Sequence, residues 1–251
     1  MHALGCYGNR LIATPAVDRL AEEGVVLDAC YCNAPLCVPS RLSLLSGKHP
    51  HRVDAWDNRS ILDPAERTFA RHLAEAGYHT CAIGKMHFNG VEQRYGFDLR
   101  PYGDLCGWSH QPDPISSVYG LSRIAAGPAE IPEEKLQETI VTREAIAFLQ
   151  RHDRQRPFLL MLGYNRPHFP FRPPARYWER YYPDGYDLPP DPPGHVQGLH
   201  PWVRAIRERH GDAMLTEEQI GRARAGYYGC VTFVDDQIAE VLAALDRLGY
   251  A

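Results

Sequence analysis

The chain is predicted to be an α/β protein with a mostly parallel sheet flanked by helices, and three observations support this. Residues 78–83 and 157–164 are short, apolar and typical of buried strands. Amphipathic helical patterns alternate with the predicted strands, as expected when crossovers join parallel strands. Both apolar segments lead into loops that carry a basic residue and a histidine, and open α/β sheets bind their ligands at such strand ends.

The first two helices are predicted from their caps. Thr14 and Pro15 begin one that ends at Gly24. Pro39 suits the first helical position of the next, because its missing N–H costs nothing there. Ser46-Gly47 ends that helix, with Gly47 free to adopt the left-handed cap. Between the two helices, residues 25–32 (VVLDACYC) are predicted to form a strand.

The remaining elements follow the same signals. Asp63-Pro64 is predicted to open a helix that ends at Gly77, and residues 138–152 show an amphipathic pattern. Residues 89–135 are loop-rich and are interpreted as a substrate-side excursion, where Trp108 and His110 are possible pocket residues. Residues 171–200 are dense in Pro and Tyr and are predicted to be an extended surface segment. A capping box at Thr216 opens a long last helix.

Composition excludes several classes of function. The 251 residues are 44% hydrophobic and 23% charged, with a net charge of −4, which is ordinary for a globular protein. Lys and Arg do not cluster, so no nucleic-acid partner is expected. No stretch of ~20 apolar residues predicts a membrane span. A secretory signal peptide is not recognised either, and both cytoplasm and periplasm stay open as compartments.

Seven cysteines are too few and too scattered for a disulfide scaffold. Cys30, Cys32 and Cys37 could be interpreted as a zinc cluster, but structural zinc sites pair two Cys-x2–4-Cys groups and no second group follows. Cys37 and Arg41 could also suggest a thiol phosphatase. That class needs Cys-x5-Arg around its phosphate, whereas the spacing here is Cys-x3-Arg.

The most informative stretch is residues 36–48, LCVPSRLSLLSGK. It places Cys37 at a helix start, where backbone N–H groups and the helix dipole favour an anion, and it places Arg41 one turn further on. Cys-x-Pro-Ser-Arg followed by Leu-Ser-Gly-Lys resembles the signature of type I sulfatases. The segments GCYGN, TPAVDRLAEEG, GKMHF and RPHFPF also resemble this family in the same order.

The resemblance implies an alkaline-phosphatase-like fold and a catalytic group formed after translation. In this family the cysteine becomes formylglycine, whose aldehyde hydrate attacks the sulfate ester. Carried over residue by residue, Cys37 is the precursor and Arg41 holds the hydrate. His87 assists hydrate breakdown as a base, while Lys85 and His168 bind sulfate oxygens or help to protonate the leaving alcohol. Conversion requires a formylglycine-generating or other maturation enzyme as a partner.

The resemblance also implies Ca²⁺, held by carboxylates and by the oxygen that derives from Cys37. The family's first strand, with its paired aspartates, and its later metal-ligand segment have no counterpart in the sequence. Residues 1–251 are therefore interpreted as a single partial sulfatase catalytic domain with an incomplete sheet. We expect little sulfatase activity from these residues alone.

The expected function is hydrolysis of a sulfuric ester. A phosphonate monoester or phosphodiester hydrolase of the same superfamily is the first alternative, because sulfate and phosphonate esters are both tetrahedral oxyanions. A catalytically inactive fragment is the second. RPHFPF resembles iduronate-type sulfatases and GKMHF resembles choline-sulfatase-type enzymes, so the substrate is expected only to be an alkyl or carbohydrate sulfate. The oligomeric state stays open.

Overall fold

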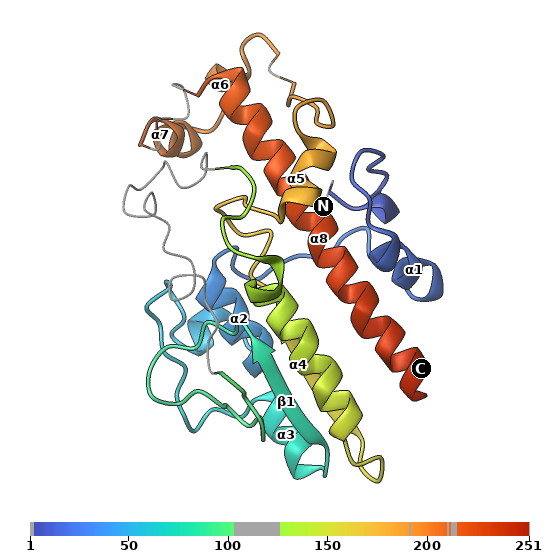
Figure 1. Cartoon of the computed structure of the whole chain (residues 1–251). Coiled ribbons are helices and arrows are strands. Elements are labelled where there is room, and N and C mark those ends of the chain that lie inside the picture. The colour runs from blue at the N-terminus through green and yellow to red at the C-terminus, as the bar shows by residue number, and fades with distance from the viewer. Residues whose placement is uncertain (1–2, 103–125, 191, 210, 212–214, 251) are drawn as a thin grey trace. The chain divides into compact units, whose positions relative to one another are not determined.

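The computed structural model describes residues 3–102, 126–190, 192–209, 211 and 215–250 (Figure 1). The chain forms two compact units. The first contains residues 1–24, 112–136 and 166–239, and the second contains residues 25–111, 137–165 and 240–251. Each unit is described by itself.

The second unit is built on a parallel pair of strands. β1 (His79–Gly84) pairs with β2 (Phe158–Gly163) in a register that places Gly84 opposite Gly163. The register brings the carboxyl ends of both strands to one edge, so the loops that follow them start side by side. The α/β class and both predicted strands are confirmed.

Helices cover both faces of this pair. On one face, α4 (Gln137–Arg151) runs beside β1 (Figure 1). Its apolar side chains pack in a cluster that includes Cys81, Ile83 and Leu160. On the other face, α2 (Cys37–Ser46) and α3 (Phe69–Glu75) belong to a cluster with Ala82, Leu159 and Met161. Alternate residues of the strands therefore supply two separate cores, which is the pattern of a sheet buried on both faces.

Two predictions for the second unit are wrong. Residues 25–32 contain no strand, and Val25 and Tyr31 are 83% and 89% exposed. A strand needs a hydrogen-bonded partner, and within the described residues this segment pairs with none. Asp63-Pro64 forms a turn instead of a helix start, because Thr68 caps α3 by accepting the Arg71 N–H. The short helix η2 (Pro50–Arg52) lies between α2 and this turn.

The first unit is helical in its described part. It holds η1 (Gly5–Tyr7), α1 (Pro15–Glu23), η4 (Glu133–Lys135), α5 (Ala175–Tyr181), α6 (His195–Gly198), α7 (Pro201–Arg209) and residues 217–239 of α8 (Glu217–Leu248). The predicted start of α1 is confirmed, but its cap is distant. The Asp235 carboxylate on α8 accepts the N–H groups of Ala16 and Val17, both at 2.9 Å.

The Pro- and Tyr-rich segment is not wholly an extended surface segment. It contains α5, whose Tyr177, Trp178 and Tyr181 are buried. The Tyr181 hydroxyl is hydrogen-bonded to the Thr232 hydroxyl on α8 at 2.6 Å. We attribute the packing of α5 on α8 to the burial of these aromatic side chains. The predicted capping box is confirmed by reciprocal bonds between Thr216 and Gln219. Among the described helices, none has the length and apolar character that a bilayer crossing requires.

Candidate active site

Cys37 is the first residue of α2 and is half-buried. The sequence places Pro39 at the first helical position, but the structure starts the helix two residues earlier, with Leu36 as its N-cap. Pro39 is tolerated there because the first-turn N–H groups have no partner inside the helix. Gly47 ends α2 in the left-handed conformation, as predicted.

The tip of α2 has fewer free donors than expected. Asn58 Oδ1 accepts the Val38 N–H at 3.0 Å, and Pro39 has no N–H. The backbone carbonyl of Asn58 in turn accepts a hydrogen bond of 2.9 Å from the side-chain Nδ2 of Asn89. The loop around residue 58 therefore caps the helix that carries Cys37. Backbone donors at this tip contribute less to anion binding than the sequence suggests, and side-chain cations must contribute more.

Arg41 links α2 to the loop after β1. It lies one turn beyond Cys37, so both side chains share a face of the helix. Its Nη1 donates a hydrogen bond of 2.8 Å to the carbonyl oxygen of Lys85. A guanidinium has five donors in a planar fork, so this one bond leaves others for an anion near Cys37. Arg41 therefore lies beside the loop that follows β1.

Lys85 is the first residue after β1 and is only 6% exposed. Its N–H donates to the Gly163 carbonyl at 2.7 Å, which extends the ladder between the strands by one step. Its Nζ donates to Asn165 Oδ1 at 3.0 Å, just beyond the end of β2. Burying an ammonium group is costly unless polar groups accept its hydrogen bonds. The Asn165 acceptor therefore offsets part of the cost of burying Lys85.

The loop backbone requires glycine at the ends of both strands. A Cβ on Gly163 would lie 2.1 Å from the Lys85 carbonyl oxygen, which is the atom that Arg41 holds. A Cβ on Gly84 would lie 2.4 Å from the Gly163 carbonyl oxygen, and Gly84 has a φ of +88°. Sequence analysis did not single out Gly163, although a glycine that ends a predicted strand is a recognisable signal.

His87 has a φ of +58°, an uncommon conformation for a residue with a side chain. Its neighbours Met86 and Phe88 are 1% and 6% exposed and anchor the turn in the α2-side core. His87 itself is half-buried. In this turn, His87 therefore lies between two buried apolar side chains.

His168 belongs to the first unit, so its place beside Cys37 stays a prediction. The structure defines its local state: Nδ1 lies 2.6 Å from the Phe169 carbonyl, and the two rings stack at 4.3 Å. Because a carbonyl only accepts, Nδ1 carries the hydrogen and Nε2 is the basic nitrogen of the neutral ring. Trp108 and His110 lie outside the described residues.

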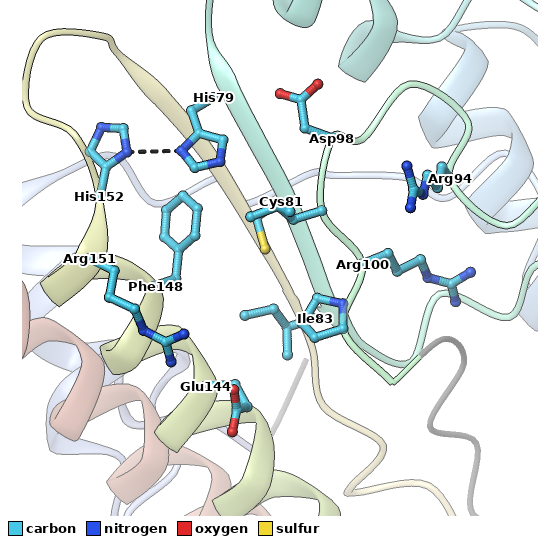
Figure 2. Close-up of a pocket in the computed structure, with 12 residues that line it drawn as sticks. His79, Cys81, Ile83, Arg94, Asp98, Arg100, Glu144, Phe148, Arg151 and His152 are labelled. Atoms are coloured by element: carbon cyan, nitrogen blue, oxygen red, sulfur yellow. Dashed lines mark hydrogen bonds between the residues drawn. The ribbon is translucent and has the colours of Figure 1, made fainter.

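A cleft of about 440 Å³ lies on the α4 face of β1 (Figure 2). Its lining does not include Cys37, Arg41, Lys85 or His87. His79, Cys81 and Ile83 line one side, and Phe148 of α4 and His152, which follows α4 directly, face them.

Burial raises the pKa of Cys81 to about 12, so this thiol stays protonated at neutral pH and is not a nucleophile. None of the residues predicted for catalysis lines this cleft, so it is not the candidate active site.

The described residues do not contain a calcium site. No group of three or more His, Cys, Asp or Glu side chains in this part of the chain is arranged to hold a metal ion. The Ca²⁺ that the sequence resemblance implies therefore has no matching ligand set among the described residues.

Comparisons with known proteins show what the chain is similar to. Mouse iduronate 2-sulfatase is 30% identical over 99% of this chain, which covers 50% of the mouse protein. Phosphonate monoester hydrolase of Agrobacterium radiobacter superposes with a TM-score of 0.76 at 22% identity, covering 98% of this chain and 57% of the hydrolase.

A further solved structure, of a protein in complex with its substrate D-glucosamine-2-N,6-O-disulfate, gives a TM-score of 0.72 at 24% identity over 99% of this chain and 60% of that protein. At these identities the two solved structures show a shared fold. The chain spans about half the length of the curated relative it matches. The family model for Sulfatase matches residues 1–251. The chain therefore belongs to the sulfatase family.

Proposed function

We propose that this chain supplies the nucleophile and the cationic cradle for hydrolysis of an alkyl or carbohydrate sulfate ester. The observation that carries the proposal is the link between α2 and β1. Arg41, one turn from Cys37, holds the carbonyl of Lys85, whose buried ammonium lies at the carboxyl end of the sheet. A sulfate ester is an anion, and fixed cations stabilise the charge that builds up on its oxygens during transfer.

The reacting group is formylglycine made from Cys37 by a maturation enzyme. One hydroxyl of its aldehyde hydrate attacks sulfur, the S–O bond to the alcohol breaks, and the alcohol leaves with a proton. The second hydroxyl then loses its proton, the C–O bond to sulfate breaks, and the aldehyde re-forms as sulfate departs. Addition of one water molecule to the aldehyde restores the hydrate. Two easier steps thus replace direct attack by water.

Each cradle residue has a role in this scheme. Arg41 holds the hydrate, and His87 takes the proton when the sulfated hemiacetal breaks down. Lys85 and His168 bind sulfate oxygens or protonate the leaving alcohol.

A phosphonate monoester hydrolase is the alternative that a specific observation favours, because such an enzyme shares the fold at a TM-score of 0.76. The similarity in sequence to a curated sulfatase, at 30% identity, favours sulfate esters. The disulfated glucosamine bound by a structural neighbour is consistent with a sugar sulfate as substrate.

The test compares two substrates with one leaving group. The chain is produced with a formylglycine-generating enzyme, and release of 4-nitrophenol is measured from 4-nitrophenyl sulfate and from 4-nitrophenyl phenylphosphonate. We expect slow release that is faster from the sulfate and is lost in Cys37→Ala. Faster release from the phosphonate supports the alternative. Equal release by the Cys37→Ala variant contradicts the proposal.

A further inference from the structure

Asn165 is placed by both strands at once. It follows β2 by two residues, and the register of the sheet brings it to the edge where Lys85 follows β1. Its Oδ1 accepts a hydrogen bond of 3.0 Å from Nζ of Lys85. Sequence analysis assigned no role to Asn165, because the bond joins residues that are 80 positions apart.

Asn165 is itself held by α4. Its backbone N–H donates to Glu138 Oε1 at 3.2 Å, and Glu138 is fully buried. The neighbouring Gln137 is 8% exposed, and its Nε2 donates to the Gly163 carbonyl at 3.4 Å. The first turn of α4 therefore fixes the backbone that carries the Asn165 amide, and a fixed acceptor restricts the orientation of the Lys85 ammonium.

The chemistry of the amide suits an anion site. A carboxylate at this position would accept the hydrogen bond from the ammonium equally well. It would, however, neutralise the positive charge of Lys85 and repel a sulfate group. An apolar side chain would leave a buried donor without this acceptor. A neutral amide oxygen orients the cation without adding a further negative charge beside it. We propose that Asn165 is a positioning residue that aims Lys85 at the substrate's sulfate group, an inference that rests on the proposed function.

The test measures affinity for inorganic sulfate, by calorimetry, in four variants of the whole chain. Asn165→Asp keeps an acceptor of the same shape and adds a negative charge. Gln155→Glu is the matched control, because it adds the same charge to an exposed residue that precedes β2, at the opposite end of the strand. Asn165→Leu removes the acceptor, and Lys85→Ala removes the cation.

We expect sulfate affinity to fall about tenfold in Asn165→Asp and to change less than about twofold in Gln155→Glu. The chain has three lysines, at positions 48, 85 and 135, so the ammonium resonance of each can be assigned by NMR. Asn165→Leu should shift the Lys85 resonance and leave the other two in place, which a general loss of stability would not do.

A variant-free measurement completes the test. During titration of the wild-type chain with sulfate, the Lys85 ammonium and the Asn165 amide carbonyl should shift with one dissociation constant. An Asn165 signal that does not respond, or wild-type affinity in Asn165→Asp, overturns the positioning role. If Lys85→Ala binds sulfate normally, the proposed function fails as well. If only Lys85→Ala weakens binding, the proposed function stands and the role of Asn165 does not.

Discussion

The pair of imidazoles in the cleft has a definite arrangement of hydrogens. His152 Nε2 lies 2.9 Å from the Arg156 carbonyl and must donate to it, so its Nδ1 is an acceptor. His79 Nδ1, at 3.1 Å, therefore donates to that nitrogen (Figure 2). Burial, followed by the nearby Arg156 and His152, lowers the pKa of His79. The folded chain thus favours the neutral ring.

This arrangement predicts how stability depends on pH. Because the folded pKa of His79 lies below its unfolded value, the unfolded chain binds more protons, so stability is complete above about pH 6.5 and falls on acidification. His79→Phe should reduce the slope of the free energy of unfolding against pH between pH 7 and pH 5. The reduction should be smaller than roughly 1.4 kcal/mol per pH unit, which is the slope for the uptake of one full proton. Urea unfolding at several pH values measures it. The exposed His195→Phe is the control, and an equal slope in His79→Phe and wild type contradicts the argument.

Single residues of the candidate site could be predicted only where a motif carries them. Cys37, Arg41, Lys85 and His87 stand in short strings that are informative by themselves. Asn165 is important only because two strands place it beside a residue 80 positions away. Such contacts depend on the register of the sheet, which no local pattern reveals.

At the scale of elements, the meeting of β1 and β2 depends on close backbone contact. Gly163→Ala would place a methyl group against the Lys85 carbonyl, and the strand and the Arg41 bond would both have to shift. We expect a loss of about 2–4 kcal/mol in the free energy of unfolding.

The matched control is Gly198→Ala in α6, where an added Cβ meets no atom within 4 Å. Its cost should stay within about 0.5 kcal/mol. Urea denaturation of both variants measures the difference. Similar values for the two substitutions would show that the strand ends are not tightly packed.

Elements with a strong internal pattern were predicted well. The strands around residues 79–84 and 158–163, α4 and α8 all follow from periodicity and caps. Two predictions failed because the deciding partner lies elsewhere in the chain. Residues 25–32 have strand composition but no partner strand among the described residues, and α5 forms in a Pro-rich segment because its aromatic side chains pack in one cluster with α8.

At the scale of the whole molecule, the sheet in the described residues has only two strands, although an apolar cluster packs on each of its faces. β1 also makes a bridge from Cys81 to Leu99, whereas in the described residues no strand pairs with the far edge of β2. In a parallel pair, successive residues of a strand direct their backbone groups to opposite sides. The carbonyls of Pro157 and Gly163 accept hydrogen bonds from His79 and Lys85. Leu160 has the opposite parity, so its N–H points to the far edge of β2. Unpaired edges of this kind favour association.

We therefore expect self-association that increases with protein concentration. Leu160→Pro removes the N–H at the far edge and should weaken association relative to Leu160→Ala, which loses a similar amount of packing but keeps the N–H. Sedimentation velocity over a range of concentrations measures both variants. A wild-type chain that stays a monomer and melts cooperatively at all concentrations would contradict this expectation.

The direct test of the whole account is the mass of the peptide that contains Cys37 after co-expression with a formylglycine-generating enzyme. Cys30 and Cys32 are exposed thiols nearby and serve as internal controls. We expect Cys37 alone to lose its thiol and gain an aldehyde that reacts with a hydrazide probe. An unmodified Cys37 thiol, under conditions that convert a known sulfatase peptide, would contradict it.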